Sequence, residues 1–373
     1  MTVSKALING AGPAGLSAAI ALARIGISVH VSEVTPDRTV LGSELLLSSA
    51  NLRALASLNV AESVVARGVP ISSIRLRAPD DTVLVTLPVP QVTPEFPPSV
   101  GISRRALHDV LYDAAVAAGA SVQHGVSIEC LHQSEDAVDV ILSDGSTATY
   151  DLVVGADGVE SRVRRLAFPD APSPEYVGQC VWRARVPRQG DPCLDAWYGA
   201  GSNVGIITVD DETSYLFCLV DLAEPPRLER TEFPALLREQ LRRYDHGLVA
   251  WTREHLGGAD DIHFSPMMWL VQPLPWHVGA VVLIGDAVHA TTPHIGYGAG
   301  LAIEDGVVLG EELEKGDELA QTLTRVGERR FERCRMVVEG GVQISRWQQS
   351  PEPHEEDQGQ LTDVIWRTLA HPV

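Results

Sequence analysis

The chain has 373 residues, of which 45% are hydrophobic and 21% charged, and 29 basic against 49 acidic residues give a formal net charge of −20. The composition excludes a disordered or fibrous protein, and the length suits about two domains. The negative charge disfavours nucleic acid and anionic membrane surfaces as partners. The five cysteines form no Cys-x-x-Cys pair and we recognise no targeting segment, so we expect a cytoplasmic protein with reduced thiols and no metal site.

Helical and strand patterns alternate along the first part of the chain, and strands dominate its middle. We expect strands at residues 6–8, 27–31, 122–126, 128–131, 137–142, 147–154 and 280–284, and alternating strand patterns from 176 to 222. We expect helices at 16–25, 49–58, 104–118, 233–244, 304–313 and 319–345. Prolines between 88 and 98 predict an irregular stretch, and the acidic segment 348–360 predicts a turn or tail. The order of elements is typical of an α/β protein.

A glycine-rich turn connects the first strand to the first helix, with the spacing Gly10-x-Gly12-x-x-Gly15. Glycines there allow a tight turn and the close approach of a pyrophosphate, which the N-terminus of the following helix attracts. Glu33 ends the second strand, 18 residues after Gly15, where a carboxylate accepts hydrogen bonds from an adenosine ribose. This unit predicts a dinucleotide site, and by itself it does not distinguish NAD from FAD.

Two later strands also lead into a glycine and a carboxylate. The strand that includes 151–154 leads into Asp157-Gly158, and the strand at 280–284 leads into Gly285-Asp286. Open α/β sheets bind ligands at the carboxyl ends of their strands, so both places are candidates for the cofactor. A glycine-rich loop at 296–300 then opens a helix, whose N-terminus would stabilise negative charge.

These three motifs, in this order, resemble those of the group A flavoprotein aromatic monooxygenases, which have the para-hydroxybenzoate hydroxylase fold. The resemblance covers about residues 5–345 and lies near the bacterial FAD-dependent urate hydroxylase and salicylate hydroxylase-like branch. It implies an α/β fold in which a Rossmann-like FAD-binding domain is interleaved with a mostly β-sheet substrate domain. The expected boundaries are 1–72, 100–174 and 270–345 for the FAD-binding domain, 73–99 and 175–269 for the substrate domain, and 346–373 for a C-terminal acidic tail or helix.

The resemblance also implies which residues bind FAD. Glu33 corresponds to the acid on the adenosine ribose, Arg104 to an arginine that contacts FAD, and Asp286 to the carboxylate on the ribityl chain. Val126 stands where the family presents backbone groups to adenine. The expected cofactor-binding residues are Gly10, Gly12, Pro13, Ala14, Gly15, Glu33, Arg38, Arg104, Val126, Asp157, Gly285, Asp286, Gly296, Tyr297 and Gly298.

Two members of this set have an alternative reading. Asp157 either contacts the cofactor directly or serves the structure of its turn, since the motif has both roles in the family. Arg38 either contacts a cofactor phosphate or is a solvated loop charge. The sequence leaves both alternatives open.

The chain departs from its relatives at three places. Tyr297 stands where they usually have Gln. The urate hydroxylases carry Asp where this chain has His294, and an Arg near Asn203 that this chain lacks, although Tyr215 falls where their catalytic tyrosine lies. We therefore do not expect urate to be the substrate.

The resemblance implies an enzyme that uses FAD, NAD(P)H and O2 to hydroxylate a small aromatic or N-heterocyclic substrate through a flavin C4a-hydroperoxide. We expect the substrate between the strands that carry Trp182, Trp197, Tyr198 and Tyr215 and the loop 293–298. His294 and Tyr215 are the candidate catalytic residues, with loop capping and core packing as the alternative roles.

Other activities of the same fold stay open: epoxidation, N-hydroxylation, Baeyer–Villiger chemistry, or an FAD dehydrogenase without oxygen insertion. The sequence does not distinguish NADH from NADPH, and it is compatible with a monomer or a homodimer. A flavin-free binding protein is the alternative outside enzymes, and a flavin absorption band would exclude it.

Overall fold

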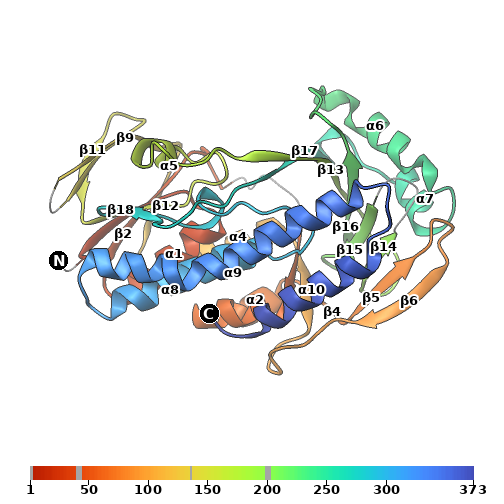
Figure 1. The fold of residues 1–373 in the computed structure, drawn as a ribbon, viewed down its shortest axis with the longest axis horizontal. Coiled ribbons are helices and arrows are strands. Elements are labelled where there is room, and N and C mark those ends of the chain that lie inside the picture. The colour runs from red at the N-terminus through yellow and green to blue at the C-terminus, as the bar shows by residue number, and fades with distance from the viewer. Residues whose placement is uncertain (1–2, 39–43, 135–136, 198–202) are drawn as a thin grey trace.

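The computed structural model describes residues 3–38, 44–134, 137–197 and 203–373, and it has two large sheets at opposite ends of an elongated molecule (Figure 1). The first sheet has six strands in the order β18 (His277–Val278), β19 (Val281–Leu283), β12 (Leu152–Gly155), β1 (Lys5–Asn9), β2 (Ser28–Glu33) and β8 (Ser121–His124). All neighbours in it are parallel except β18, which pairs with β19 in the antiparallel sense. This is the open parallel sheet that the first βαβ unit predicts.

Both faces of the six-stranded sheet are covered, which explains the short apolar runs of its strands. Ala6 and Ile8 of β1 pack on one side into a core with the first helices, whereas Leu7 between them packs on the other side. The helices of the first side are α1 (Pro13–Arg24), α2 (Ser49–Ser57), α3 (Ala61–Ala66), α4 (Arg104–Ala117) and α8 (Gly298–Glu314). The second side holds α5 (Arg162–Ala167) and a three-stranded antiparallel sheet of β9 (Ile128–Gln133), β10 (Val138–Leu142) and β11 (Thr147–Tyr150).

The single strand expected at 147–154 is two strands that belong to different sheets. Asp151 lies between them, and its carboxylate accepts hydrogen bonds from the backbone N–H groups of Ser4 and Lys5 at 2.7 and 2.8 Å. These bonds fasten the chain to the start of β1, where β12 begins to pair in parallel. The expectation of one strand is therefore wrong, because a continuous apolar pattern does not reveal a change of sheet.

The second large sheet has seven strands in the order β17 (Ile262–Trp269), β13 (Glu175–Pro187), β16 (Thr213–Asp221), β15 (Asn203–Thr208), β14 (Leu194–Trp197), β5 (Ser73–Arg77) and β6 (Val83–Pro88). Its outer face is covered by α6 (Phe233–Gln240) and α7 (Gly247–Glu254), whose Leu237 and Val249 join the core beneath them. Its inner face looks toward the six-stranded sheet.

A small third sheet connects the two large ones, with β7 (Ser99–Ile102) between β3 (Leu45–Ser48) and β4 (Val69–Ile71). A Cβ atom at Gly101 would lie 1.9 Å from the backbone oxygen of Thr208 in β15. Only glycine lets the two backbones approach this closely. The contact places the start of α4 against the inner face of the seven-stranded sheet.

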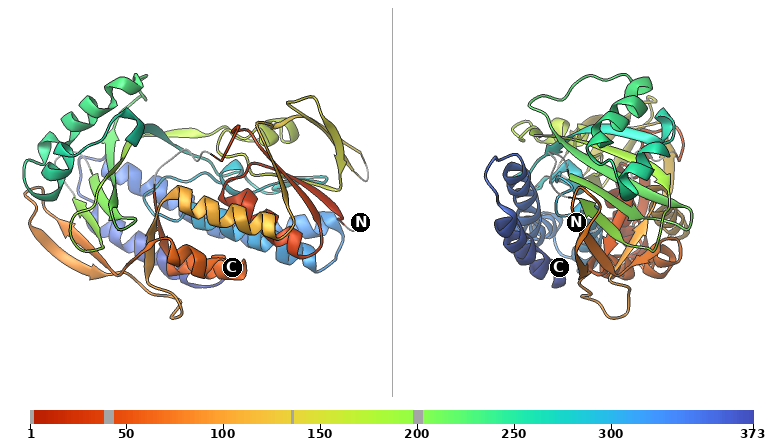
Figure 2. Two further views of the ribbon diagram at one scale, coloured as in Figure 1. Left: turned by 180° about the vertical axis from the view of Figure 1, so that it is seen from behind. Right: turned by 90° about the vertical axis from the view of Figure 1, so that its right-hand side faces the viewer.

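The C-terminal segment ends the fold with two long helices that lie side by side on one flank of the molecule (Figure 2). α9 (Leu319–Gln348) runs along both regions, and α10 (Glu355–Ala370) packs on it. The acidic turn expected at 348–360 is in part wrong, because Glu355, Glu356 and Asp357 form the first turn of α10, where they favour the helix dipole. Among the described helices, none combines the length and apolar character needed to cross a membrane.

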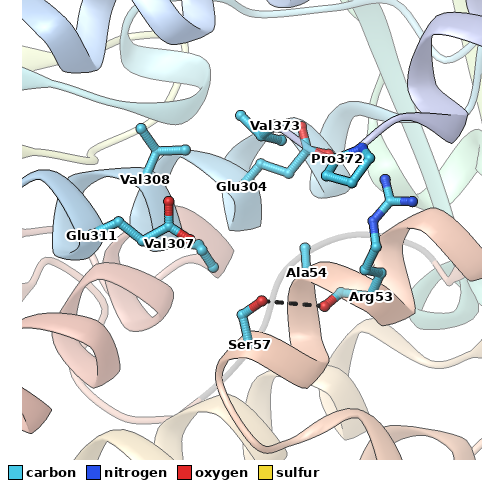
Figure 3. A pocket seen from close by; sticks show the side chains of 9 residues that line it. All are labelled: Arg53, Ala54, Ser57, Glu304, Val307, Val308, Glu311, Pro372 and Val373. Atoms are coloured by element: carbon cyan, nitrogen blue, oxygen red, sulfur yellow. Dashed lines mark hydrogen bonds between the residues drawn. The ribbon is translucent and has the colours of Figure 1, made fainter.

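The residues after α10 close a small hollow between α2 and α8. Its volume is about 160 Å³, and Figure 3 shows Pro372 and Val373 on one side of it, opposite Ala54 and Val307. The end of α10 therefore lies close to helices that support the six-stranded sheet.

Candidate functional site

The turn between β1 and α1 leaves room for a ligand beside the backbone. Gly10 has a φ of +112°, and a Cβ atom there would lie 2.3 Å from the backbone oxygen of Ala156. A Cβ atom on Gly15 would lie 1.9 Å from the oxygen of Gly10, whereas no described atom lies within 4 Å of the Cβ position on Gly12. α1 begins at Pro13 without a side-chain cap, so its first N–H groups are left for a ligand or solvent.

The three sequence motifs meet at one edge of the six-stranded sheet. The Cβ position of Gly10 lies 3.1 Å from the Cα atom of Asp157, and that of Gly285 lies 2.7 Å from the Cβ atom of Ala14. This follows from the topology, because β1, β12 and β19 are parallel neighbours and their carboxyl ends share an edge. A dinucleotide that spans this edge would contact all three turns.

Glu33 lies at the end of β2, next to the turn. One carboxylate oxygen accepts a hydrogen bond from the N–H of Ala11 at 2.8 Å, and the other accepts bonds from the N–H and hydroxyl of Thr35. The backbone N–H of Val126 donates to the carbonyl of Glu33 at 3.0 Å, so these two predicted contacts lie side by side. The carboxylate is held in position at the place where an adenosine ribose would bind.

Arg38 is held by α4 rather than by the glycine turn. Its guanidinium forms an ion pair with Asp113 at 2.7 Å and lies 3.6 Å from the ring centre of Tyr112. His108, one turn after Arg104 on the same helix, lies beside the backbone of Ala11, and burial lowers the pKa of its imidazole. His108 Nδ1 is buried and has no hydrogen-bond partner among the described residues. Sequence reasoning missed His108, because only the fold brings α4 to the turn.

Asp157 caps a helix. Its carboxylate accepts hydrogen bonds from the N–H groups of Arg162 and Val163 at 2.7 and 3.1 Å, from the hydroxyl of Ser161, and from the amide of Asn9 at 3.0 Å. These four hydrogen bonds join the start of α5 to the end of β1 through the Asp157 carboxylate. The geometry favours the structural alternative for Asp157.

Asp286 follows Gly285 at the end of β19 and faces Arg104. The Asp286 side chain is exposed to solvent, yet surrounding protein desolvates its carboxyl and raises its pKa, against the charges of His289 and Arg104. Burial also lowers the pKa of the Arg104 guanidinium, opposed by the charge of Asp286, so the two charges lie within electrostatic reach.

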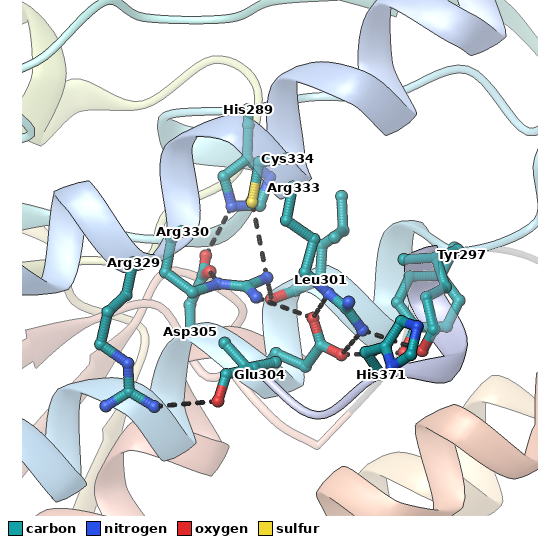
Figure 4. A network of polar contacts seen from close by, with 12 residues as sticks. His289, Tyr297, Leu301, Glu304, Asp305, Arg329, Arg330, Arg333, Cys334 and His371 are labelled. Atoms are coloured by element: carbon teal, nitrogen blue, oxygen red, sulfur yellow. Dashed lines mark hydrogen bonds and ion pairs between the residues drawn. The ribbon is translucent and has the colours of Figure 1, made fainter. Parts of the chain in front are cut away.

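A buried network of charges supports the turn at Gly285 (Figure 4). One oxygen of Asp305 accepts bonds from the N–H of Gly285 at 2.7 Å and from His289 Nε2 at 2.6 Å, and the other accepts from Arg330 at 2.7 Å. Burial alone would raise the pKa of Asp305, but His289 and Arg330 outweigh it and hold that pKa at about 2. His289 thereby stays charged, and its pKa lies well above the usual value.

His289, Asp305 and Cys334 lie close enough together to share a metal ion in the described part of the chain. Arg330 already donates to Asp305 and to the sulfur of Cys334 at 3.4 Å. A guanidinium supplies the positive charge of this cluster, so we assign it a structural role.

In the glycine loop before α8, Gly296 is exposed and Gly298 is half-buried, whereas the side chain of Tyr297 points into the protein. Gly296 has a φ of +73° and no described atom within 4 Å of its Cβ position. Tyr297 is 1% exposed, and its hydroxyl donates to Glu304 at 2.9 Å. Only the backbone of Tyr297 can therefore face a cofactor on the open side.

His294 lies in the same loop but turns toward the end of α9. Its Nδ1 atom is 2.9 Å from the hydroxyl of Thr292, and its Nε2 atom is buried without a partner among the described residues. Burial lowers the pKa of His294 to about 4, with a smaller opposing contribution from Gln348, so the imidazole is neutral at pH 7. Within the described contacts, His294 and Tyr215 are not brought together.

The inner face of the seven-stranded sheet lies opposite Arg104. The pairing register places Arg183 of β13 beside Phe217, and Arg185 beside Tyr215, on this face. The charges of Arg183, Tyr215 and Glu44 all act on the pKa of Arg104, so these groups surround it. Glu44 is buried and forms an ion pair with Arg185 at 3.3 Å.

The tryptophans expected around the substrate lie on the other face of this sheet. Trp182 packs against Phe233 and Phe264, and Trp197 belongs to the same core beneath α6 and α7. These two tryptophans are therefore core residues of the sheet that carries them, because alternate residues of a strand point to opposite faces. Tyr198 lies outside the described residues.

Comparison with known proteins decides the family. A model of the FAD binding domain matches residues 3–338. The chain belongs to this family. It is 30% identical to the aurachin C monooxygenase/isomerase of Stigmatella aurantiaca, over 92% of this chain and 90% of that protein. It is 31% identical to the 2-heptyl-3-hydroxy-4(1H)-quinolone synthase of Pseudomonas aeruginosa, over 81% and 79%.

A solved structure supports the same assignment. HpxO from Klebsiella pneumoniae, complexed with FAD and uric acid, superimposes with a TM-score of 0.83 at 25% identity, over 98% of this chain and 92% of that chain. The predicted fold, with an FAD-binding domain and a sheet-rich domain, is confirmed. The prediction of an FAD-dependent monooxygenase of this family is confirmed as well.

The residues of the structure fit FAD. The open Gly12 turn at the N-terminus of α1 suits a pyrophosphate, and the accessible Asp286 suits a polyhydroxyl chain. The backbone at Gly296 leaves space for the edge of a flat ring, and the imidazole of His108, whose Nδ1 atom has no partner among the described residues, lies beside the backbone of Ala11 in the glycine turn.

Proposed function

We propose that this protein is an NAD(P)H- and O2-dependent monooxygenase that hydroxylates a small aromatic or N-heterocyclic substrate through a flavin C4a-hydroperoxide. In the balanced reaction one proton is consumed, the substrate gains one oxygen atom of O2, the other oxygen atom leaves as water, and NAD(P)H is oxidised to NAD(P)⁺. The observation that carries the proposal is the close approach of Gly101 to Thr208, which sets the start of α4 against the seven-stranded sheet, where Arg104 lies within electrostatic reach of Asp286, a predicted FAD contact, and of the sheet residues Arg183 and Tyr215. The FAD-binding edge and a polar sheet face thus converge on one place.

The cofactor supplies the redox chemistry, and the chain's own residues bind, orient and exclude water. Asp286 would hold the ribityl chain, Glu33 the adenosine ribose, and the turn at Gly12 the pyrophosphate. The N-terminus of α8 behind Gly296 and Gly298 would stabilise negative charge on the ring edge. The relatives of this chain are named for quinolone, aurachin and urate chemistry, which supports a flat heterocycle or aromatic ring as substrate.

Arg183 and Tyr215 are the groups best placed to meet the substrate. In the described residues Arg183 donates to the hydroxyl of Ser265 at 2.8 Å and forms no ion pair. A guanidinium of this kind would stabilise a phenolate or a lactam anion, and such anions react faster with an electrophilic oxygen donor. Tyr215 would orient the substrate oxygen by hydrogen bonding.

His294 is the second candidate for the proton transfer. A neutral imidazole can accept a proton, but a pKa of about 4 makes His294 a weak base, and Thr292 already holds its Nδ1 atom. We therefore assign the larger effect on oxygenation to Tyr215 and Arg183.

The test uses the FAD-loaded enzyme with NADH or NADPH, isotopically labelled O2 and a panel of phenols, anilines and N-heterocycles. We expect a substrate that stimulates NAD(P)H consumption and gains one labelled oxygen atom. Reduction of the flavin without label in any product would instead support a dehydrogenase, and a labelled epoxide, N-oxide or ester would support the other chemistry of the fold. Arg183→Gln should lower kcat/KM by about 10²-fold, which corresponds to ~3 kcal/mol, whereas Arg230→Gln, an exposed control outside the inner face, should have no effect.

A further inference from the structure

The last turn of α10 is held by arginines from two other helices. Arg53 of α2 donates to the carbonyls of Ala370 and His371 at 2.7 and 2.9 Å, and Arg333 of α9 donates to those of Thr368 and Leu369 at 2.9 and 3.1 Å. The last carbonyls of a helix have no partner within it, so these guanidinium groups complete the end of α10. α10 is thereby fixed to the core of the FAD-binding region.

The same Arg333 guanidinium continues the chain of contacts inward (Figure 4). It forms two bonds to the carboxylate of Glu304, at 2.7 and 3.0 Å, and Glu304 accepts the hydroxyl of Tyr297 at 2.9 Å. Tyr297, Glu304 and Arg333 are all buried, so these charges and dipoles are screened little by solvent.

A second, apolar contact joins α10 to the same tyrosine. The rings of Trp366 and Tyr297 meet edge to face, with centres 5.8 Å apart and planes at 87°. Ile365, which is fully buried, lies over Gly340 of α9, where a Cβ atom would approach it to 2.4 Å. The ring of Tyr297 is therefore fixed by a polar contact at its hydroxyl and by an aromatic contact at its edge, and both contacts lead to α10.

The backbone of Tyr297 lies between the two glycines that face the flavin. It is the residue before α8, and Gly296 has a left-handed φ of +73°. Two flexible glycines can adopt many conformations, and an anchored side chain between them selects one. This explains the departure from glutamine at position 297, because a phenol reaches Glu304 and Trp366 from this backbone position.

We propose that α10 is a strap that fixes the conformation of the glycine loop, and that Tyr297, Trp366 and Arg333 are positioning residues for the flavin. The proposal rests on the assignment of this loop to the flavin in the proposed function. It concerns binding of the cofactor and order of the loop, so it does not depend on which substrate is hydroxylated.

The experiment compares Trp366→Leu, Tyr297→Phe and Tyr297→Gln with the parent, in the full chain. It measures the Kd for FAD, the visible circular dichroism of bound flavin, and hydrogen exchange of residues 291–300 in the FAD-free protein. If the loop is ordered for only a tenth of the time, the Kd for FAD rises about tenfold. We expect that rise, with faster exchange of the loop and a changed flavin spectrum, for Trp366→Leu, and a smaller rise for Tyr297→Phe, which keeps the ring.

Controls separate this role from general stability. Arg335→Gln changes a half-buried arginine of α9 whose ion pairs among the described residues are with Glu332 and Glu339 and whose guanidinium lies over the ring of Phe331, and it should change none of the three measurements. A lower melting temperature with unchanged FAD affinity, spectrum and loop exchange in Trp366→Leu and both Tyr297 variants would overturn the proposal. Tight FAD binding without substrate oxygenation in the parent would contradict the proposed function alone.

Discussion

The charged groups beneath the glycine loop 296–298 and those on its open side differ in how their charges are paired. Beneath the loop, Glu304, Asp305, Arg330 and Arg333 are nearly inaccessible and each has several partners in the protein. On the open side, Asp286 is exposed and desolvated, and the one hydrogen-bond partner of the Arg183 guanidinium among the described residues is the hydroxyl of Ser265. A closed network supports the fold, whereas incompletely paired groups indicate where a ligand binds.

The closed network gives the largest expected effect. Glu304→Gln keeps the shape of the side chain but removes the carboxylate with which Arg333 pairs among the described residues, and one of the two carboxylates that pair with Arg330. Loss of one partner in a buried ion pair costs about 3–5 kcal/mol. We expect the urea unfolding midpoint, measured at a fixed FAD concentration, to fall accordingly.

The exposed pair of Arg367 and Asp363 on α10 provides the control, since both side chains are more than half exposed. Arg367→Gln should cost less than ~1 kcal/mol. Equal effects of the two substitutions would contradict the view that the network beneath the loop is a structural scaffold.

The next effect is a pH dependence that His294 should cause. Burial lowers its pKa to about 4 in the folded protein, against 6.5 in an unfolded chain. Between these values the unfolded chain binds a proton that the folded chain does not, so stability falls as the pH drops from 6.5 to 4, by up to ~3 kcal/mol. Urea unfolding at pH 7 and pH 5 should show this loss.

His294→Gln should reduce the loss, because the titrating imidazole is gone. Asp305 and Glu312 do not interfere, since ion pairs hold both of their pKa values at about 2 and their contributions are lost only as the pH falls below about 4. An unchanged difference between pH 7 and pH 5 in the variant would show that His294 is solvated in solution.

Local patterns were sufficient to predict the three turns that meet at one edge of the six-stranded sheet. The turns at Gly10–Gly15, Asp157 and Gly285 each follow a short apolar strand, and parallel pairing of those strands brings the three turns together. The sequence also predicted most helices, because their apolar periodicity is local. The break at Asp151 was missed and the C-terminal segment was left open between a tail and a helix, since both depend on contacts with distant segments such as the start of β1 and the α9 surface.

The substrate side was predicted less well for a related reason. Trp182 and Trp197 are prominent in the sequence, but they lie in the core beneath α6 and α7. The face to which a strand residue points depends on the pairing register, which a single sequence does not determine. Arg183, Glu44 and His108 have no motif around them, and they become candidates only when β13 and α4 are placed beside the FAD-binding edge. Charge partners that are hundreds of residues apart leave no local signal.

A substitution of Asp286 tests whether the exposed side of the glycine loop binds FAD. A charge-assisted hydrogen bond to the ribityl hydroxyls contributes roughly 1.5–3 kcal/mol. Asp286→Ala should therefore fold but purify with little bound flavin, with the affinity for FAD reduced at least ~10-fold. Asp144→Ala, in an exposed turn, should leave flavin content unchanged. Unchanged affinity in Asp286→Ala would remove this residue from the FAD site.

The smallest expected effect concerns Arg38, for which the sequence left a phosphate contact and a solvated charge open. In the structure its guanidinium is paired with Asp113 and stacked on Tyr112, and both charged side chains are more than a third exposed. Such a pair contributes ~0.2–1 kcal/mol. If the ion pair with Asp113 is the only charged contact of Arg38 in the FAD-bound protein, Arg38→Gln and Asp113→Asn should lower stability equally. Both variants should then leave the Kd for FAD within about twofold of the parent value. A phosphate contact would separate them, because only Arg38→Gln would then remove a charge-assisted bond and raise the Kd about tenfold or more. Titration of FAD into both apo variants decides between the two roles.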